Sequence, residues 1–70
     1  MQQSNPEVVQ TVVDGLKSTD PGLRSFAAAT LAEMGPQAGD ALTALADSLD
    51  DRDGYVRLHA AEVLIRYEQW

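Results

Sequence analysis

Apolar residues recur every three or four positions in four stretches of the chain, and short polar stretches separate them. This spacing is typical of amphipathic helices that bury one face. Alternating polar and apolar runs that end in hairpin turns, which would indicate strands, are missing from the sequence. The pattern therefore predicts an all-α fold with four antiparallel helices, over about residues 6–17, 21–34, 38–49 and 54–69.

Polar and helix-breaking residues mark most of the expected helix ends. Asn5 and Asp20 each precede a proline, and a short polar side chain followed by proline is a typical helix start. Asp53 predicts the start of the fourth helix in a similar way. Gly35 and Pro36 predict the end of the second helix, because glycine tolerates a left-handed backbone and proline cannot continue a helix.

The second pair of predicted helices repeats the sequence of the first pair. A shift of 33 residues aligns identical residues at several positions, and the apolar positions around them agree as well. Chance alone would give far fewer matches, so an internal repeat is the better explanation. The identical pairs are Asp14/Asp47, Leu16/Leu49, Asp20/Asp53, Arg24/Arg57, Ala27/Ala60, Ala28/Ala61 and Leu31/Leu64.

Four aligned charged residues and one set of apolar residues are expected to hold the helices together. Asp20 and Asp53 are predicted N-caps that accept hydrogen bonds from the free amides of the second and fourth helices. Arg24 and Arg57 follow four residues later, where each can pair with its aspartate or reach the carbonyls that end the preceding helix. All four are therefore assigned a structural role. The predicted core consists of Leu16, Leu23, Leu31, Leu45, Leu49, Val56 and Leu64.

Residues 49–64 carry the pattern L-x-D-x-D-G-Y-V-R-x-x-A-A-x-x-L, and residues 16–31 carry a version with Ser18 in the place of Asp51. This pattern resembles the short HEAT-like repeat, a form also found in phycobilisome-lyase-type proteins. The resemblance covers nearly the whole chain, although a period of 33 residues is shorter than the usual HEAT length of about 40–47. It implies an α-solenoid fragment of two helix pairs in a single domain, 1–70, with repeats over about 6–36 and about 38–70.

An acidic cluster at residues 50–53 precedes the fourth helix. A calcium loop needs carboxylates at its first and last positions, but aligning Gly54 with the invariant glycine places Leu49 and Ala60 there. No nucleophile or glycine-rich phosphate loop accompanies the cluster, and His59 has no second nitrogen or sulfur ligand nearby. The sequence therefore predicts no enzyme activity, no catalytic residue, no metal site and no cofactor.

The charge and composition of the chain narrow the choice of partners. A net charge of −6 argues against nucleic acid, since eleven carboxylates outnumber five Lys and Arg residues. No apolar run is long enough to cross a membrane, and the N-terminal sequence lacks the regions of a signal peptide. The absence of cysteine also favours a cytoplasmic location. The acidity favours a basic or apolar protein partner.

The resemblance implies a protein-interaction scaffold, because repeat solenoids bind partners on a broad surface lined by their second helices. A helix or extended peptide that carries Lys or Arg beside an apolar anchor would suit this surface. The second repeat is more apolar than the first, and its uncovered end predicts either a homo-oligomer or a neighbouring repeat. The predicted partner surface consists of Ser25, Ala29, Glu33, Leu58, Glu62 and Arg66, and the predicted self-association residues are Leu58, Ile65, Tyr67 and Trp70.

Two other functions stay open at this point. One is an accessory domain of a phycobilin lyase-type protein, which depends on the family resemblance alone. The other is a self-associating structural repeat, natural or designed, in which the interface is itself the function.

Overall fold

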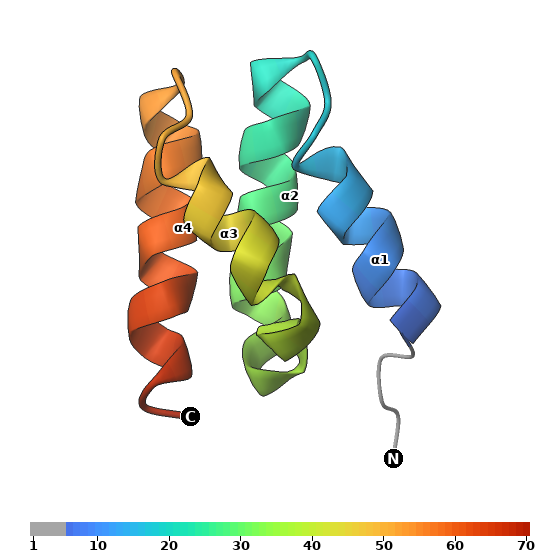
Figure 1. Ribbon diagram of the computed structural model, residues 1–70, viewed down its shortest axis with the longest axis vertical. Coiled ribbons are helices and arrows are strands. Elements are labelled where there is room, and N and C mark those ends of the chain that lie inside the picture. The colour runs from blue at the N-terminus through green and yellow to red at the C-terminus, as the bar shows by residue number, and fades with distance from the viewer. Residues whose placement is uncertain (1–5) are drawn as a thin grey trace.

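The computed structural model describes residues 6–70, and these residues form helices and no strand (Figure 1). The all-α fold is therefore confirmed. The expected N-cap Asn5 lies outside the described residues. The elements are α1 (Pro6–Gly15), α2 (Pro21–Met34), the 3-10 helix η1 (Gly35–Ala41), α3 (Leu42–Ser48) and α4 (Gly54–Tyr67).

The four α-helices form two pairs that lie side by side. Helix α2 is the central element, since it packs against α1, η1 and α4. Helix α3 lies across the gap between α2 and α4, and α1 flanks α2 on the other side (Figure 1). The first repeat is the pair α1 and α2, the second repeat is the pair α3 and α4, and η1 links them at the lower edge of the view.

The second helix has the predicted bounds, while the third differs most from its prediction. Helix α1 ends at Gly15 instead of residue 17, and α4 ends at Tyr67 instead of residue 69. The predicted helix over 38–49 is divided between η1 and the shorter α3. Gly35 has a φ of 69°, which turns the chain out of α2, and the glycine- and proline-containing sequence that follows disfavours a regular α-helix.

One apolar core lies between the helices, and alanines occupy many of its positions. Ala28 and Ala60 are fully buried where α2 and α4 approach each other, so small side chains allow close packing of the two helices. Leu64 is partly buried and packs against this core. The buried hydrophobic residues are Val9, Val13, Leu16, Ala27, Ala28, Leu31, Ala38, Ala41, Leu45, Val56, Ala60 and Val63.

Two residues of the predicted core are exposed, so their assignment was wrong. Leu23 is 54% exposed and Leu49 is 41% exposed. Their counterparts in the other repeat, Val56 and Leu16, are buried. The difference has a positional cause: each repeat covers only one side of the other, and the outer side of each repeat has no neighbour among the described residues.

Candidate functional site

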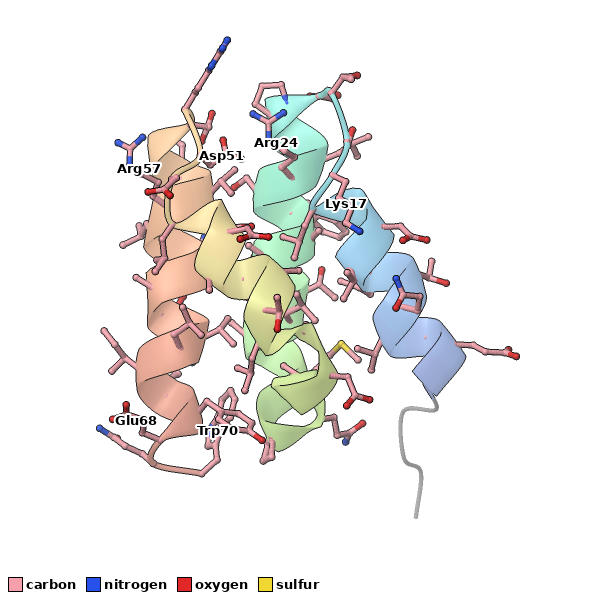
Figure 2. The ribbon with its side chains drawn as sticks, in the orientation of Figure 1. Lys17, Arg24, Asp51, Arg57, Glu68 and Trp70 are labelled. Carbon is pink, nitrogen blue, oxygen red and sulfur yellow. The ribbon has the colours of Figure 1, made fainter. Side chains whose placement is uncertain are left out.

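A salt bridge joins the interhelical turns of the two repeats. Arg24, in the first turn of α2, donates from Nε to Oδ2 of Asp51 at 2.8 Å and from Nη2 to Oδ1 at 3.0 Å. Its third nitrogen, Nη1, donates to the carbonyl oxygen of Ser18 at 2.9 Å. Both charged side chains are largely covered. Arg24 therefore connects the turn of its own repeat to the turn of the next one, and we call the Arg24–Asp51 pair the clamp (Figure 2).

The clamp also changes the acidity of its carboxylate. The paired guanidinium of Arg24 lowers the pKa of Asp51, and a hydrogen bond from the backbone N–H of Asp53 at 2.9 Å lowers this pKa further. Both contacts stabilise the charged form of the carboxylate. Asp51 is therefore held as an anion that is already fully engaged by the protein.

The other charged groups of the two turns are mostly engaged as well. Oδ1 of Asp20 accepts from the backbone N–H of Gly22 at 2.8 Å, and Oδ1 of Asp53 accepts from Tyr55 at 2.8 Å. These contacts are N-caps of α2 and α4. Nη1 of Arg57 donates to the carbonyl oxygens of Asp51 and Arg52, at 2.8 and 3.1 Å. Both arginines thus reach carbonyl oxygens of the loops that follow α1 and α3, beyond the helix ends where the sequence placed them.

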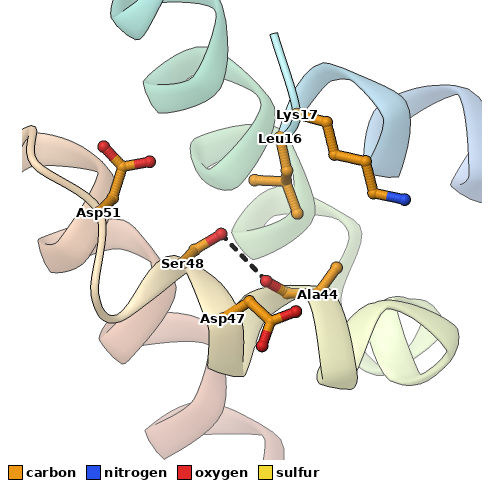
Figure 3. Close-up of a pocket in the computed structure, with 6 residues that line it drawn as sticks. All are labelled: Leu16, Lys17, Ala44, Asp47, Ser48 and Asp51. Atoms are coloured by element: carbon orange, nitrogen blue, oxygen red, sulfur yellow. Dashed lines mark hydrogen bonds between the residues drawn. The ribbon is translucent and has the colours of Figure 1, made fainter. Parts of the chain in front are cut away.

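A small hollow of about 130 Å³ lies beside the clamp, where the end of α1 meets α3 (Figure 3). The hydroxyl group of Ser48 donates to the carbonyl oxygen of Ala44 at 3.0 Å, and the amine of Lys17 points away from the two carboxylates. The volume is below the range of about 300–1,000 Å³ that is usual for small-molecule sites. Its lining residues are Leu16, Lys17, Ala44, Asp47, Ser48 and Asp51. The candidate functional sites are therefore surfaces.

The predicted partner-surface residues lie on α2 and α4. Glu33, Leu58 and Arg66 are exposed, whereas Ser25, Ala29 and Glu62 are half-buried. Glu62 bonds to Arg66 at 3.0 Å and lies 3.3 Å from His59, so part of its charge is already balanced. Glu33 has no such partner among residues 6–70.

Two aromatic residues of this surface were missed by the sequence analysis. Phe26 is 70% exposed and lies on the same side of α2 as Ala29 and Glu33, at helical spacings of three and seven residues. Tyr55 is 68% exposed and lies on the same side of α4 as Glu62, at a spacing of seven residues. The alignment of Phe26 with His59 indicates a packing or interface position, and in the structure His59 is half-buried while Phe26 is exposed. We define the outward face as Ser25, Phe26, Ala29, Glu33, Tyr55, Leu58, Glu62 and Arg66.

The predicted self-association residues fall into two groups. Leu58 and Ile65 are well exposed on α4. Tyr67 and Trp70 instead pack against each other edge to face, with ring centroids 6.1 Å apart, at the lower end of α4 (Figure 2). A Cβ atom on Gly39 would lie 2.7 Å from the hydroxyl oxygen of Tyr67, so a larger residue there would displace the end of this side chain. The two aromatic side chains therefore contribute to contacts within the chain.

An apolar groove of about 220 Å³ opens on the first repeat, between α1 and α2. A shift of 33 residues places Val12, Leu23 and Thr30 of this groove on Leu45, Val56 and Val63, which are fully buried against the first repeat. The groove therefore corresponds to the side of the second repeat that docks on α2. It is lined by Thr11, Val12, Gly15, Leu23, Phe26, Ala27 and Thr30.

The repeated helix pairs and the stacking of one pair on the next agree with the comparison to known families, in which a model for HEAT repeats matches residues 2–65. The chain belongs to the HEAT-repeat family. HEAT repeats are generally scaffolds for protein–protein interaction and typically have no catalytic role. No curated protein and no solved structure gives a significant match.

Two further observations concern what this HEAT-repeat pair contacts. No described helix has both the length and the apolar composition needed to cross a membrane. Among residues 6–70, His, Asp and Glu side chains form no group of three or more that could hold a metal ion.

Proposed function

We propose that this HEAT-repeat pair is a non-catalytic protein-binding module, and that its outward face binds a helix or an extended peptide with Lys or Arg beside an apolar residue. The exposure of Phe26 and Tyr55 is the observation that carries this proposal. Large aromatic side chains supply much of the binding energy at protein interfaces, because each buries a large apolar area with little loss of conformational freedom. Two of them on one face suit an apolar anchor of a partner.

The charges of the outward face favour a basic partner. Glu33 is exposed and unpaired within the described chain, about two helical turns from Phe26 on the same side of α2. A Lys or Arg of the partner would pair with Glu33 while a neighbouring apolar residue contacts Phe26. The net charge of −6 adds a long-range attraction for such a partner and raises its association rate.

A library of displayed 15-residue peptides, selected on the immobilised protein, tests this proposal. We expect the enriched peptides to combine Lys or Arg with Leu, Phe or Met at helical or alternating spacing. The variant with Phe26→Ser and Tyr55→Ser should lose these peptides, because both exposed anchors are removed. Its far-ultraviolet circular dichroism should match that of the parent, since both side chains lie mainly in solvent.

A matched charge reversal separates local pairing from long-range attraction. Glu33→Lys should weaken the selected peptides more than Glu7→Lys, which makes the same change of net charge at an exposed position of α1. The difference should appear mainly in the association rate at low salt. Enriched peptides without basic residues, or equal binding to the Phe26 and Tyr55 variant, would contradict the proposal.

The other two functions from the sequence stay hypotheses. The family match names HEAT repeats and no subtype, so a role beside a phycobilin lyase rests on the sequence resemblance. Self-association through Leu58, Ile65, Tyr67 and Trp70 remains a proposal, and sedimentation of the protein at high micromolar concentration tests it directly.

A further inference from the structure

The second repeat covers one side of the first repeat. The equivalent side of the second repeat has no neighbour within the described chain. Leu16 is 6% exposed because the second repeat covers it, whereas its counterpart Leu49 is 41% exposed. Ala32 is half-buried, whereas its counterpart Ile65 is 62% exposed. We call this side the open face, and we define it as Leu49, Arg57, Leu64 and Ile65.

Arg57 is the counterpart of Arg24, but it makes only part of the contacts of Arg24. In both arginines, Nη1 donates to the carbonyl oxygen of the residue six positions earlier, at 2.9 Å in Arg24 and 2.8 Å in Arg57. Nε and Nη2 of Arg24 hold the carboxylate of Asp51. The same two atoms of Arg57 have no hydrogen-bond partner among residues 6–70, and Figure 2 shows its guanidinium on the outer side of α4.

The internal interface therefore specifies what would fit the open face. The second repeat docks on the first with two features: an apolar side that contains Leu45, Val56 and Val63, and an aspartate in the turn between its helices. A partner on the open face would need the same two features to cover the apolar side chains and to pair with Arg57. Arg and carboxylate groups form two parallel hydrogen bonds in this geometry, which makes the contact selective for a carboxylate.

A second copy of the chain supplies only one of these features. Its groove between α1 and α2 is the apolar counterpart of the docking side. However, its turn carries Ser18 at the position of Asp51, and a hydroxyl group cannot form the ion pair with Arg57. The sequence of the first repeat thus disfavours head-to-tail stacking of identical chains, which would otherwise continue without closing.

We propose that the open face binds a HEAT-type helix pair of another protein that carries an aspartate in its interhelical turn, and that Arg57 selects this carboxylate. The proposal deepens the proposed function, because it names a second surface of the same binding module and the kind of partner that fits it. It depends on Arg57, which is not part of the outward face, so it can fail while the outward face still binds peptides.

The chain itself provides the probe for this proposal. The donor protein is the variant with Ser18→Asp and Ile65→Asp, which presents the missing carboxylate and carries a charge on its own open face, so donors do not bind one another. The carboxylate introduced at position 18 can take over the local contact of Ser18, because the Ser18 hydroxyl accepts the N–H of Asp20 just as Asp51 accepts the N–H of Asp53. The acceptor is the unmodified protein, labelled with a fluorophore.

We expect the donor to bind the unmodified protein in a 1:1 complex, measured by sedimentation velocity and fluorescence anisotropy. A control donor with Ile65→Asp alone should bind about tenfold more weakly, since it lacks the carboxylate for Arg57. A second control donor with Ser18→Asn in place of Ser18→Asp should behave like this weaker donor, because it adds a similar side chain without charge.

The acceptor variant Arg57→Gln identifies the selecting residue. It should bind the donor with Ser18→Asp and the control donor that retains Ser18 equally, while circular dichroism verifies that it remains folded. Three results would overturn the proposal: no binding of the donor with Ser18→Asp, equal binding of both donors to the unmodified protein, or a preference for the introduced carboxylate that survives in Arg57→Gln. Self-association of the unmodified protein as tight as donor binding would show instead that the open face takes a second copy.

Discussion

The same leucine occupies the same position of both repeats, which allows the effect of covering to be measured directly. Leu16 is 6% exposed and Leu49 is 41% exposed, although each directly follows the first α-helix of its repeat. The variants Leu16→Ala and Leu49→Ala therefore make the same chemical change in two environments. We expect Leu16→Ala to lower the free energy of unfolding much more than Leu49→Ala.

The expected magnitudes follow from the exposed fractions. Truncation to alanine removes three carbon groups, or about 2.4 kcal/mol of transfer free energy for a fully buried side chain at about 0.8 kcal/mol each. Leu16 loses nearly all of this and leaves a cavity, so we expect a cost of about 3 kcal/mol. Leu49 retains contact with water, so roughly 1.4 kcal/mol is an upper limit, and about 1 kcal/mol is expected because no closed cavity forms.

Urea unfolding, followed by circular dichroism at low micromolar protein, measures this difference. With a slope of about 1 kcal/mol per molar urea for so small a domain, the two midpoints should lie about 2 M apart. The whole domain is stable by only about 3–5 kcal/mol, so Leu16→Ala is measured in sucrose if it is already unfolded in buffer. An equal loss of unfolding free energy in the two variants, at every protein concentration, would refute the argument that Leu16 is covered by a neighbouring repeat and Leu49 is not.

Three further predictions concern the turns. The guanidinium paired with Asp51 lowers the pKa of this carboxyl group, so the charged form stabilises the fold above the unfolded pKa of about 3.9, and this contribution is lost as the pH falls through the folded pKa. Asp51→Asn should flatten the acid side of the plot of melting temperature against pH, and an unchanged plot would contradict the clamp. Gly35→Ala should cost about 1–3 kcal/mol at a φ of 69° and a ψ of −143°, whereas Gly54→Ala, at the start of α4, should be neutral or stabilising in the same urea assay. Asp53→Ala removes the cap of α4 and should lower the free energy of unfolding by about 0.5–2 kcal/mol. The control Asp50→Ala should change it by less than about 0.5 kcal/mol, because the Asp50 side chain makes no hydrogen bond or ion pair within residues 6–70. A similar melting temperature for both variants would argue against the cap.

The sequence predicted local structure well where strong signals bound an element. Helix α2 begins and ends at the predicted residues, because Asp20 and a proline mark its start and Gly35 and a proline mark its end. The third helix was predicted less well, since Gly39 and its neighbours allow both a 3-10 and an α conformation. The internal repeat was evident because the matching residues are those that cap helices or allow close packing.

Properties that depend on the neighbouring repeat could not be read from the sequence. The period of apolar residues shows which side of a helix faces inward, but it does not show whether another element covers that side, so Leu23 and Leu49 were assigned to the core. Arg24 had a nearby candidate in Asp20, yet it pairs with Asp51, 27 residues away. Only the stacking of the repeats brings that pair together, and the exposure of Phe26 follows from the same stacking.

The clamp has a consequence for the stability of the molecule, because it ties the repeats at the edge opposite to their covalent link. The peptide chain joins α2 to α3 through η1 at the lower edge of Figure 1, and Arg24 and Asp51 meet near the upper edge in Figure 2. A covalent link is permanent, whereas an ion pair is weakened by salt and by acid. When salt or acid weakens the clamp, the packing of α4 against α2 and the peptide link through η1 still join the two repeats. The upper edge of the repeat pair is thus the place where its stability depends on ionic conditions, through one pair of side chains.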